Sequence, residues 1–526
     1  MLVKVYPGVF SQVVEGLESL LRMPFGCFEQ TSSITYPNVL ALDYLRTSGQ
    51  TAPEVELKAE EYINLGYQRL TTFEVAGGGF SLFGNPPADR MLTAYGLQEF
   101  ADMARVHPVD DALVRRAAEW LMSQQSGNGS WENDRGLVHE NTWQSLGNDR
   151  LPVTGYVVWS LIDAGFERET AVQKGLAYLR DHLGEAKDPY VLGLVANALV
   201  SADRAQGEGT GTATRAALDA LAAQAQRSGG QVFWQSQVAT FTGAEGQTGS
   251  IETTALATLA MLRAQEYPDL TSGALAYLIA QKDSFGTWHS TQATVLSLKA
   301  LLEAMRAGGD QVDARVTITL NGGQVRTLQV TQDNFDVVQM VTFEDVPLGR
   351  ENAVDICVEG QGNLMAQVVG SYYLPWGAMS RYPDLFPVGE GLDLQVSYDR
   401  TELSVDDTVT VQVSATLQPA GARAEAVMLD LGIPPGFSVM TEDLDALVTR
   451  YSDVLPSETR LERYELTGRQ VMVYLTGMKG GEPFTFNYRL RARFPLRAQA
   501  PSALAYDYYN PQQQGELPPQ LLVVNP

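Results

Sequence analysis

Cys27 and Gln30 are the residues of this sequence best suited to form a reactive bond with each other. They are three positions apart in MPFGCFEQT (residues 23–31), at the predicted start of a helix, and side chains at that spacing are neighbours. A thiol that faces a carboxamide can attack it, expel ammonia and leave a thioester. The exposed N–H groups of a helix start favour the thiolate and the oxyanion of this chemistry. The alternative is a buried cysteine beside a surface pair, Glu29 and Gln30.

Composition excludes several other classes of function. The 526 residues carry a net charge of -25, and such an acidic surface repels nucleic acid. Two cysteines and four scattered histidines form neither a disulfide framework nor a metal cluster, so we expect no metal and no cofactor. No apolar run is long enough to cross a bilayer, and MLVKVYPGVF lacks the layout of a signal peptide.

Residues 11–307 are predicted to be almost continuously helical, with two kinds of helix in alternation. One kind is nearly uncharged and apolar on most sides, which predicts burial, while the other is amphipathic and charged, which predicts a surface position. Six inner and six outer helices indicate an α/α toroid. The inner helices are expected at 31–45, 91–103, 153–164, 189–201, 251–262 and 291–305, and the outer helices at 11–22, 54–70, 110–123, 170–183, 213–226 and 272–281.

Glycine-rich turns that carry an aromatic residue precede several inner helices. They centre on Phe80, Trp131, Trp234 and Trp288, and their spacing fits one or two repeats of roughly fifty residues. One repeat before Phe80 lies Phe28, beside Cys27, which predicts that Cys27 also lies in a turn that enters an inner helix. We interpret the aromatic residues of these turns as core side chains that fill the toroid between its layers.

The sequence after residue 308 is typical of β-structure, so the predicted fold class is a multidomain chain of α and β domains. The segment DARVTITLNGGQVRTLQV alternates with period two around an NGG turn, and more strands follow to about residue 373, which predicts a small β-domain at 308–376. Residues 377–391 are rich in proline and glycine and indicate a linker. Residues 392–526 contain the strand pattern of a β-sandwich, interrupted by one short helix at 442–448.

The pattern P-x-G-C-x-E-Q-T at the start of a helix resembles the thioester motif of the alpha-2-macroglobulin and complement family. The usual residue after the cysteine is small in that family, whereas this chain has Phe28. The resemblance covers nearly the whole chain. It includes VYPG near the N-terminus, LTAYGL at 92–97, VTGYVVWSL at 153–161, STQATVLSLKAL at 290–301, IPPGF at 433–437 and YDYYNP at 506–511.

This resemblance implies a domain order. Residues 11–307 would be the thioester domain, inserted in a CUB-type β-domain formed by a residual strand at 1–10 and by 308–376. Residues 392–526 would be the receptor-binding-like domain. Macroglobulin domains would precede this chain in its parent, so we expect a fragment of a longer protein. The helix at 442–448 lacks the lysines that a receptor would bind, and we infer no receptor binding from it.

The resemblance also implies a function, which is covalent capture rather than enzymatic turnover. A protease cuts a bait region in the upstream domains, the thioester becomes exposed, and a lysine of the protease is acylated once. The partners would be target proteases or surface nucleophiles, together with the upstream macroglobulin domains. The location would be secreted or periplasmic, and a lipid-anchored parent chain is compatible with it.

His139 opens an alternative within the same family, namely complement-like tagging of surfaces. In complement members a histidine at a similar place takes the acyl group from the cysteine, and the freed thiolate then activates a hydroxyl nucleophile. Asn141 is the competing equivalent, and members with asparagine there prefer amines.

The family shields its thioester with aromatic residues, and the resemblance assigns that role here to Phe83 and to Tyr508 or Tyr509. Phe80 is a further candidate shield, and core packing is the alternative for all four. Cys357 lies in a predicted strand and is expected to be an inert core residue. Gly26 and Glu29 belong to the motif.

Other classes of protein remain as alternatives. An enzyme on an α/α toroid, such as a terpenoid cyclase or a glycosidase, would need an Asp-rich motif or a carboxylate pair, and the sequence contains neither in a convincing position. A cysteine hydrolase that uses Cys27 and His139 would turn over many substrates. A binding module without a thioester would keep both cysteines as thiols.

Overall fold

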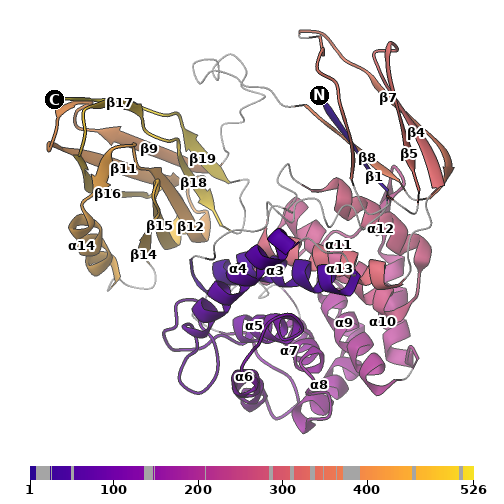
Figure 1. Cartoon of the computed structure of the whole chain (residues 1–526). Helices are drawn as coiled ribbons and strands as arrows, with labels where there is room; N and C mark the ends of the chain where they lie inside the picture. The colour runs from indigo at the N-terminus through magenta and orange to yellow at the C-terminus, as the bar shows by residue number, and fades with distance from the viewer. Residues whose placement is uncertain are drawn as a thin grey trace. The chain divides into compact units, whose positions relative to one another are not determined.

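The helices between residues 28 and 307 form an inner ring and an outer layer in the computed structural model (Figure 1). Contacts between elements divide the chain into two units, residues 1–371 and residues 372–526. The structure describes residues 1–7, 24, 26–48, 53–134, 146, 148–207, 209–282, 288, 290–307, 313–331, 334, 338–347, 349–362, 364–370, 391–452, 458–508 and 513–526.

The inner helices are buried along most of their length, as their nearly uncharged sequences predict. Each inner helix contacts the next one along the chain, and the last returns to the first, so the ring is closed. This confirms the predicted α/α toroid. The inner helices in the described residues are α3 (Phe28–Ser48), α5 (Arg90–Met103), α7 (Arg150–Asp163), α9 (Pro189–Gln206), α11 (Gly246–Ala264) and α13 (Thr291–Ala307).

An outer helix packs on each of the first five inner helices within the described residues. The outer helix predicted at 11–22 lies outside those residues. The helix predicted at 272–281 begins earlier, at Pro268, and buries apolar residues on several sides, so its prediction as a charged, amphipathic helix was wrong. The outer helices are α4 (Pro53–Thr71), α6 (Asp111–Ser123), α8 (Thr170–Asp181), α10 (Thr212–Ala223) and α12 (Pro268–Ala280), and a hairpin of β2 (Gln226–Ser228) and β3 (Gln231–Phe233) follows α10.

Ion pairs between inner helices show that these helices run in the same direction. Arg306 in the last turn of α13 pairs with Asp43 on α3 at 2.6 Å. Arg204 near the end of α9 pairs with Glu303 on α13 at 2.7 Å. The last turns of these helices therefore meet at one end of the ring, which we call its C-terminal end. The turns that lead into the inner helices lie at the opposite, N-terminal end.

Residues before and after the helical ring in the sequence form one small β-domain. β1 (Leu2–Tyr6) lies between β6 (Gln339–Thr342) and β8 (Met365–Val369) and pairs antiparallel with both. A second sheet has the order β5-β4-β7, and the two sheets share an apolar core. The helical ring is thus an insertion between β1 and β4. The strands of the second sheet are β4 (Asp313–Leu320), β5 (Gln324–Val330) and β7 (Val354–Gln361).

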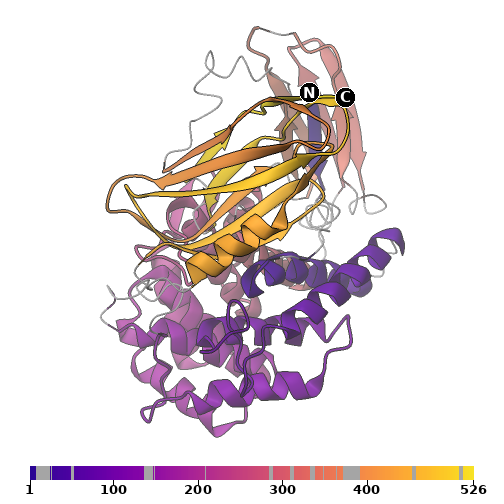
Figure 2. The same ribbon diagram turned by 90° about the vertical axis from the view of Figure 1, so that its left-hand side faces the viewer.

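The C-terminal unit is a β-sandwich with one helix, α14 (Thr441–Ser452), beside it (Figure 2). In the described residues, its larger sheets have the orders β13-β16-β11-β9 and β14-β15-β12-β18-β19, a third has the order β10-β20-β17, and one apolar core fills the interior. This confirms the predicted sandwich. Its strands are β9 (Leu392–Tyr398), β10 (Glu402–Ser404), β11 (Thr408–Leu417), β12 (Arg423–Gly432), β13 (Phe437–Val439), β14 (Arg460–Leu466), β15 (Gln470–Lys479), β16 (Pro483–Ala492), β17 (Leu496–Gln499), β18 (Ala503–Asp507), β19 (Gln514–Leu517) and β20 (Leu521–Asn525).

Candidate functional site: the start of the first inner helix

The structure brings Cys27 and Gln30 together at the start of α3. The helix begins at Phe28, so Cys27 directly precedes it and Gln30 lies in its first turn. The backbone N–H of Cys27 donates a hydrogen bond to Oε1 of Gln30 at 3.0 Å. The carboxamide of Gln30 therefore folds back over the backbone of the residue that carries the thiol. This bond also polarises the carbonyl that a sulfur atom would attack.

The side chains of Cys27, Glu29 and Gln30 are shielded from water. Cys27 is 6% exposed, Gln30 is 5% exposed and Glu29 is 2% exposed. The alternative in which Glu29 and Gln30 are a surface pair is therefore wrong. An activated acyl group hydrolyses in water, so burial is a requirement of the thioester chemistry as well as a consequence of packing.

Gly26 provides the space for this arrangement. Its φ of +91° lies in the left-handed region that favours glycine. A Cβ atom at this position would lie 2.1 Å from Oε1 of Gln30 and 2.9 Å from its Cδ atom. The glycine of the motif is therefore needed both for the backbone turn and for the path of the glutamine side chain.

Arg69, in the last turn of α4, contacts the same segment. Its Nε and Nη2 atoms donate to the carbonyl oxygen of Gly26 at 3.1 and 2.6 Å. Nε also lies 3.2 Å from the hydroxyl of Thr31. No motif in the sequence singles out this arginine, because the contact joins two helices that only the fold brings together.

Phe28 packs into the apolar core of the helical domain. Its side chain is fully buried, 5.2 Å from the ring of Phe80 and edge-on to Phe73 at 6.0 Å. Gly96 on α5 makes room for it, since a Cβ atom there would lie 2.6 Å from Cζ of Phe28. The large residue after the cysteine is thus accommodated by a glycine on the next inner helix.

The aromatic turns share one hydrogen-bonding pattern, which explains the repeat. The backbone N–H of each aromatic residue donates to a threonine hydroxyl in the first three turns of the following inner helix, and each tryptophan indole donates to a carbonyl near the end of the preceding outer helix. The threonine acceptors of Phe80, Trp131, Trp234 and Trp288 are Thr93, Thr154, Thr254 and Thr294, at 2.9 to 3.1 Å, and the indole acceptors are the carbonyls of Leu121, Leu221 and Leu278, at 2.5 to 2.7 Å.

The first repeat departs from this pattern where the chemistry is expected. Phe28 is not the equivalent aromatic residue, because its N–H donates to the carbonyl of Leu82 at 2.9 Å. Thr31 is in the fourth position of α3, as Thr93 is in α5, but its hydroxyl lies near the Gly26 carbonyl and Arg69. The hydroxyl that elsewhere holds an aromatic turn here contacts the segment beside Cys27.

Family comparisons cover most of the chain. Residues 3–303, more than half of the chain, match the family described as the A-macroglobulin TED domain. The chain belongs to the alpha-2-macroglobulin family. Residues 422–517 also match its receptor binding domain.

Individual relatives agree with this assignment. Thioester-containing protein 1 allele R1 of Anopheles gambiae is 25% identical over 512 residues, which cover 96% of this chain and 35% of that protein. Ovostatin of Gallus gallus is 23% identical over 525 residues, which cover 96% of this chain and 34% of ovostatin. The chain thus spans about a third of the length of these curated relatives.

Solved structures of bacterial alpha-2-macroglobulins share the fold over 100% of this chain. The native Escherichia coli protein from domain MG7 to the C-terminus has a TM-score of 0.65 at 16% identity, with 77% of that chain covered. The Salmonella protein reacted with methylamine has a TM-score of 0.65 at 17% identity, with 31% of that chain covered. The alpha-2-macroglobulin fold is therefore present from the first strand to the sandwich.

The predicted shielding residues fall into three groups. Phe80 is fully buried and packs against Phe28 and Phe100, which agrees with a core role. Phe83 is half-buried and directly follows Leu82, whose carbonyl binds the N–H of Phe28, so its segment runs beside the motif. Tyr508 belongs to the C-terminal unit, where its N–H donates to the carbonyl of Ala426 at 2.9 Å.

Three other predicted positions lie outside the described residues, namely His139, its competitor Asn141 and Tyr509. Cys357 lies in β7 as predicted, but it is exposed, so its prediction as a core residue was wrong. Within the described ranges, no group of histidine, cysteine and carboxylate side chains could hold a metal ion. None of the helices in those ranges is both long and apolar enough to cross a membrane.

The centre of the ring contains a charged cluster that the sequence did not predict. Lys299 is 7% exposed, and its ammonium group lies 3.1 Å from Asp102 and 3.2 Å from Oε1 of Gln98. The hydroxyl of Tyr36 donates to Asp102 at 2.6 Å. Burial alone would raise the pKa of Asp102, but Lys299 and Arg105 outweigh it and lower this pKa to about 2.

Burial raises the pKa of two further carboxyl groups, those of Glu99 and Glu252. Burial raises the pKa of Glu99 to about 8, although Lys299 opposes this shift. Burial also raises the pKa of Glu252 to about 7, against the hydrogen bond from the Ser290 hydroxyl at 3.0 Å. Polar side chains inside nearly uncharged helices were visible in the sequence, but nothing in the spacing indicated that they face one another.

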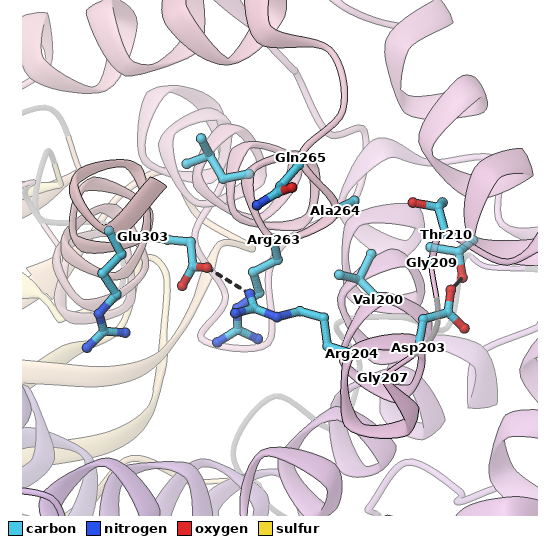
Figure 3. A pocket seen from close by; sticks show the side chains of 13 residues that line it. Val200, Asp203, Arg204, Gly207, Gly209, Thr210, Arg263, Ala264, Gln265 and Glu303 are labelled. Carbon is cyan, nitrogen blue, oxygen red and sulfur yellow. Dashed lines mark hydrogen bonds and ion pairs between the residues drawn. The ribbon is translucent and has the colours of Figure 1, made fainter. Parts of the chain in front are cut away.

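A cavity of about 540 Å³ lies at the C-terminal end of the ring, between α9, α11 and α13 (Figure 3). Its charged side chains bind neighbouring residues. Arg204 binds Glu303, and the Thr214 hydroxyl donates to Asp203 at 2.6 Å. Arg263, which also lines the cavity, pairs with Asp163 at 3.0 Å. The cavity therefore offers little uncompensated charge to a ligand.

Proposed function

We propose that this chain is the thioester-bearing part of an alpha-2-macroglobulin that captures proteases covalently outside the cytoplasm, in a secreted or periplasmic parent protein. One observation carries the proposal. The carboxamide of Gln30 is folded onto the N–H of Cys27 in a buried site at the start of an inner helix. Membership in the alpha-2-macroglobulin family supports the same chemistry.

The bond would form by attack of the Cys27 sulfur on Cδ of Gln30. The S–C bond forms, the negative charge collects on Oε1, and the C–N bond then breaks. The amide nitrogen leaves as ammonia with the thiol proton. The Cys27 N–H already binds Oε1 at 3.0 Å, so the charge appears beside a fixed donor.

Capture would reverse the roles of the sulfur and nitrogen atoms. A lysine amine of the protease attacks Cδ, an amide bond forms, and sulfur leaves as the thiolate and takes up a proton. The product amide does not regenerate the thioester, so each chain reacts once. The chain is therefore proposed to be a stoichiometric inhibitor and not an enzyme.

Intact mass and thiol titration test the thioester. The freshly purified chain should be lighter than its sequence mass by one ammonia, and methylamine should add to it and release one thiol. Cys357 provides the internal control, because it is exposed and should titrate in both states. In a Cys357→Ala variant the thiol count should rise from none to one, whereas Cys27→Ala should neither lose ammonia nor bind methylamine. A fresh chain of full sequence mass with an alkylated Cys27 would overturn the proposal.

The nucleophile distinguishes protease capture from surface tagging. We expect methylamine to react much faster than glycerol, because a protease is captured through a lysine. Rapid transfer to glycerol that His139→Ala abolishes would instead support complement-like tagging. Release of many product molecules per chain would point to the hydrolase alternative.

A further inference from the structure

The Gly26–Cys27 peptide group connects Arg69 to the proposed reaction centre. The carbonyl oxygen of this group belongs to Gly26 and accepts two hydrogen bonds from Arg69, at 3.1 and 2.6 Å. The N–H of the same group belongs to Cys27 and donates to Oε1 of Gln30 at 3.0 Å. A charged donor at one end of a peptide group thus lies opposite the donor that faces the reacting carbonyl.

Hydrogen bonds at the two ends of one peptide group strengthen each other. A positively charged donor bound to the carbonyl oxygen draws electron density away from the nitrogen of the same peptide group. This makes the N–H a stronger hydrogen-bond donor. Bonds that involve a guanidinium are also shorter and stronger than neutral ones. Arg69 therefore increases the ability of the Cys27 N–H to stabilise negative charge on Oε1 of Gln30.

The surroundings hold the guanidinium in place. Its central carbon lies 5.9 Å from the ring centre of Phe73, which itself packs edge-on against Phe28. Nε of Arg69 lies 3.2 Å from the hydroxyl of Thr31, which is in the first turn of α3. Arg69 thus links the end of α4, the loop before α3 and the first turn of α3.

We infer that Arg69 is a positioning residue of the thioester, acting through the Gly26–Cys27 peptide group. This inference rests on the proposed function. The same N–H would stabilise the oxyanion twice. It acts first when sulfur adds to Cδ and ammonia leaves, and again when an amine adds to Cδ and the Cys27 thiolate leaves and is protonated. Arg69 neither contacts the nucleophile nor carries a proton in either step.

The test compares Arg69→Met and Arg69→Lys with the wild-type chain in intact mass and in the rate of methylamine addition. Methionine keeps the apolar length of the side chain but removes the charge, and lysine keeps the charge but not the two-pronged geometry. We expect addition to slow about 10- to 100-fold in Arg69→Met, somewhat less than when an oxyanion donor is removed outright. Arg69→Lys should be intermediate.

Arg116→Met is the matched control, because it removes an exposed guanidinium that pairs with Glu74, just beyond α4. It should react at the wild-type rate. Equal rates in the wild type and Arg69→Met, at equal folded fraction by circular dichroism, would overturn the inference alone. If Arg69→Met fails to fold, a wild-type rate in Arg69→Lys has the same meaning. A wild-type chain that loses no ammonia overturns the proposed function, and this inference with it.

Discussion

The two ends of the helical ring solve opposite electrostatic problems. At the N-terminal end, the aromatic turns bind threonine hydroxyls of the inner helices, acidic residues lie at the helix starts, and Arg69 contacts the loop before α3. At the C-terminal end, arginines lie in the last turns of α3, α9, α11 and α13. Most of these arginines pair with carboxylates of neighbouring helices.

Parallel helices explain this difference. Each helix carries partial positive charge at its start and partial negative charge at its end, so a ring of parallel helices concentrates both effects. Arginines offset the negative end. Carboxylates offset the positive end, at the N-caps of α5, α7, α9 and α11 and in the first turn of α3. At the start of α3, Arg69 adds a positive charge beside the carbonyl of Gly26, next to the proposed reaction centre.

Gly26→Ala should give the largest effect and should break the chemistry at the N-terminal end. The new Cβ atom would lie 2.1 Å from Oε1 of Gln30, so the carboxamide cannot stay over Cys27. We expect ammonia loss and methylamine uptake to fall below detection by mass spectrometry. Gly165→Ala is the control, since its φ of +87° is equally strained but open space surrounds it. Normal thioester formation in Gly26→Ala would contradict the assigned geometry.

Lys299→Met should instead affect the stability of the ring. It leaves Asp102 buried without its ammonium partner, which typically costs about 3–5 kcal/mol. Urea denaturation should show this loss in the free energy of unfolding. Arg150→Met removes a pair whose side chains are 38% and 47% exposed, and it should cost at most about 1 kcal/mol. Similar losses in both variants would mean that the buried cluster has no special role.

Gly96→Ala tests how the ring accommodates the large residue after the cysteine. The added methyl group would meet Cζ of Phe28 at 2.6 Å, and such overpacking costs about 1–3 kcal/mol. A Phe28→Leu change in the same chain should recover part of this loss, which a double-mutant cycle would measure. Strict additivity of the two changes would show that the residues are not coupled.

Glu99→Gln should alter the pH dependence of the free energy of unfolding, and its effect between neighbouring pH values should be small. The pKa of Glu99 is raised from 4.5 to about 8, so the folded state holds a proton that the unfolded state releases. Stability should therefore fall as pH rises from about 4.5 to about 8, by at most about 1.4 kcal/mol per pH unit from this group.

The Glu99→Gln variant should lose this part of the decline, as measured by urea denaturation across that pH range. Glu252→Gln should act in the same direction over a shorter range, because the pKa of Glu252 is about 7. Parallel pH profiles in Glu99→Gln and the wild type would contradict the assigned protonation.

The sequence predicted the toroid and the motif because both depend on local patterns. Uncharged helices alternating with charged ones indicate two layers, and Cys27 and Gln30 are neighbours through the geometry of one helical turn. The aromatic turns were correctly interpreted as core, although the threonines that bind them were not recognised. A threonine in the first three turns of the inner helix after each aromatic turn was the available signal.

Contacts between distant segments could not be predicted in the same way. Arg69 reaches Gly26 only because α4 folds back along α3, and Lys299 meets Asp102 only because α13 closes the ring on the other inner helices. Gly96 gave a partial signal, since a lone glycine inside a helix often marks close packing. Cys357 was misplaced because alternation in an edge strand does not show which face is covered.

The pairing of β1 with β6 and β8 fastens both ends of a very long loop, since the helices of the ring lie between β1 and β4. A single cut anywhere in the helices would leave two pieces that are still joined by a five-residue strand and by the packing of the ring. A chain nicked in this way should migrate as one body until it is denatured. Under the proposed function, a nucleophile bound to Gln30 would stay associated with β4 and the strands that follow it for as long as the two pieces hold together.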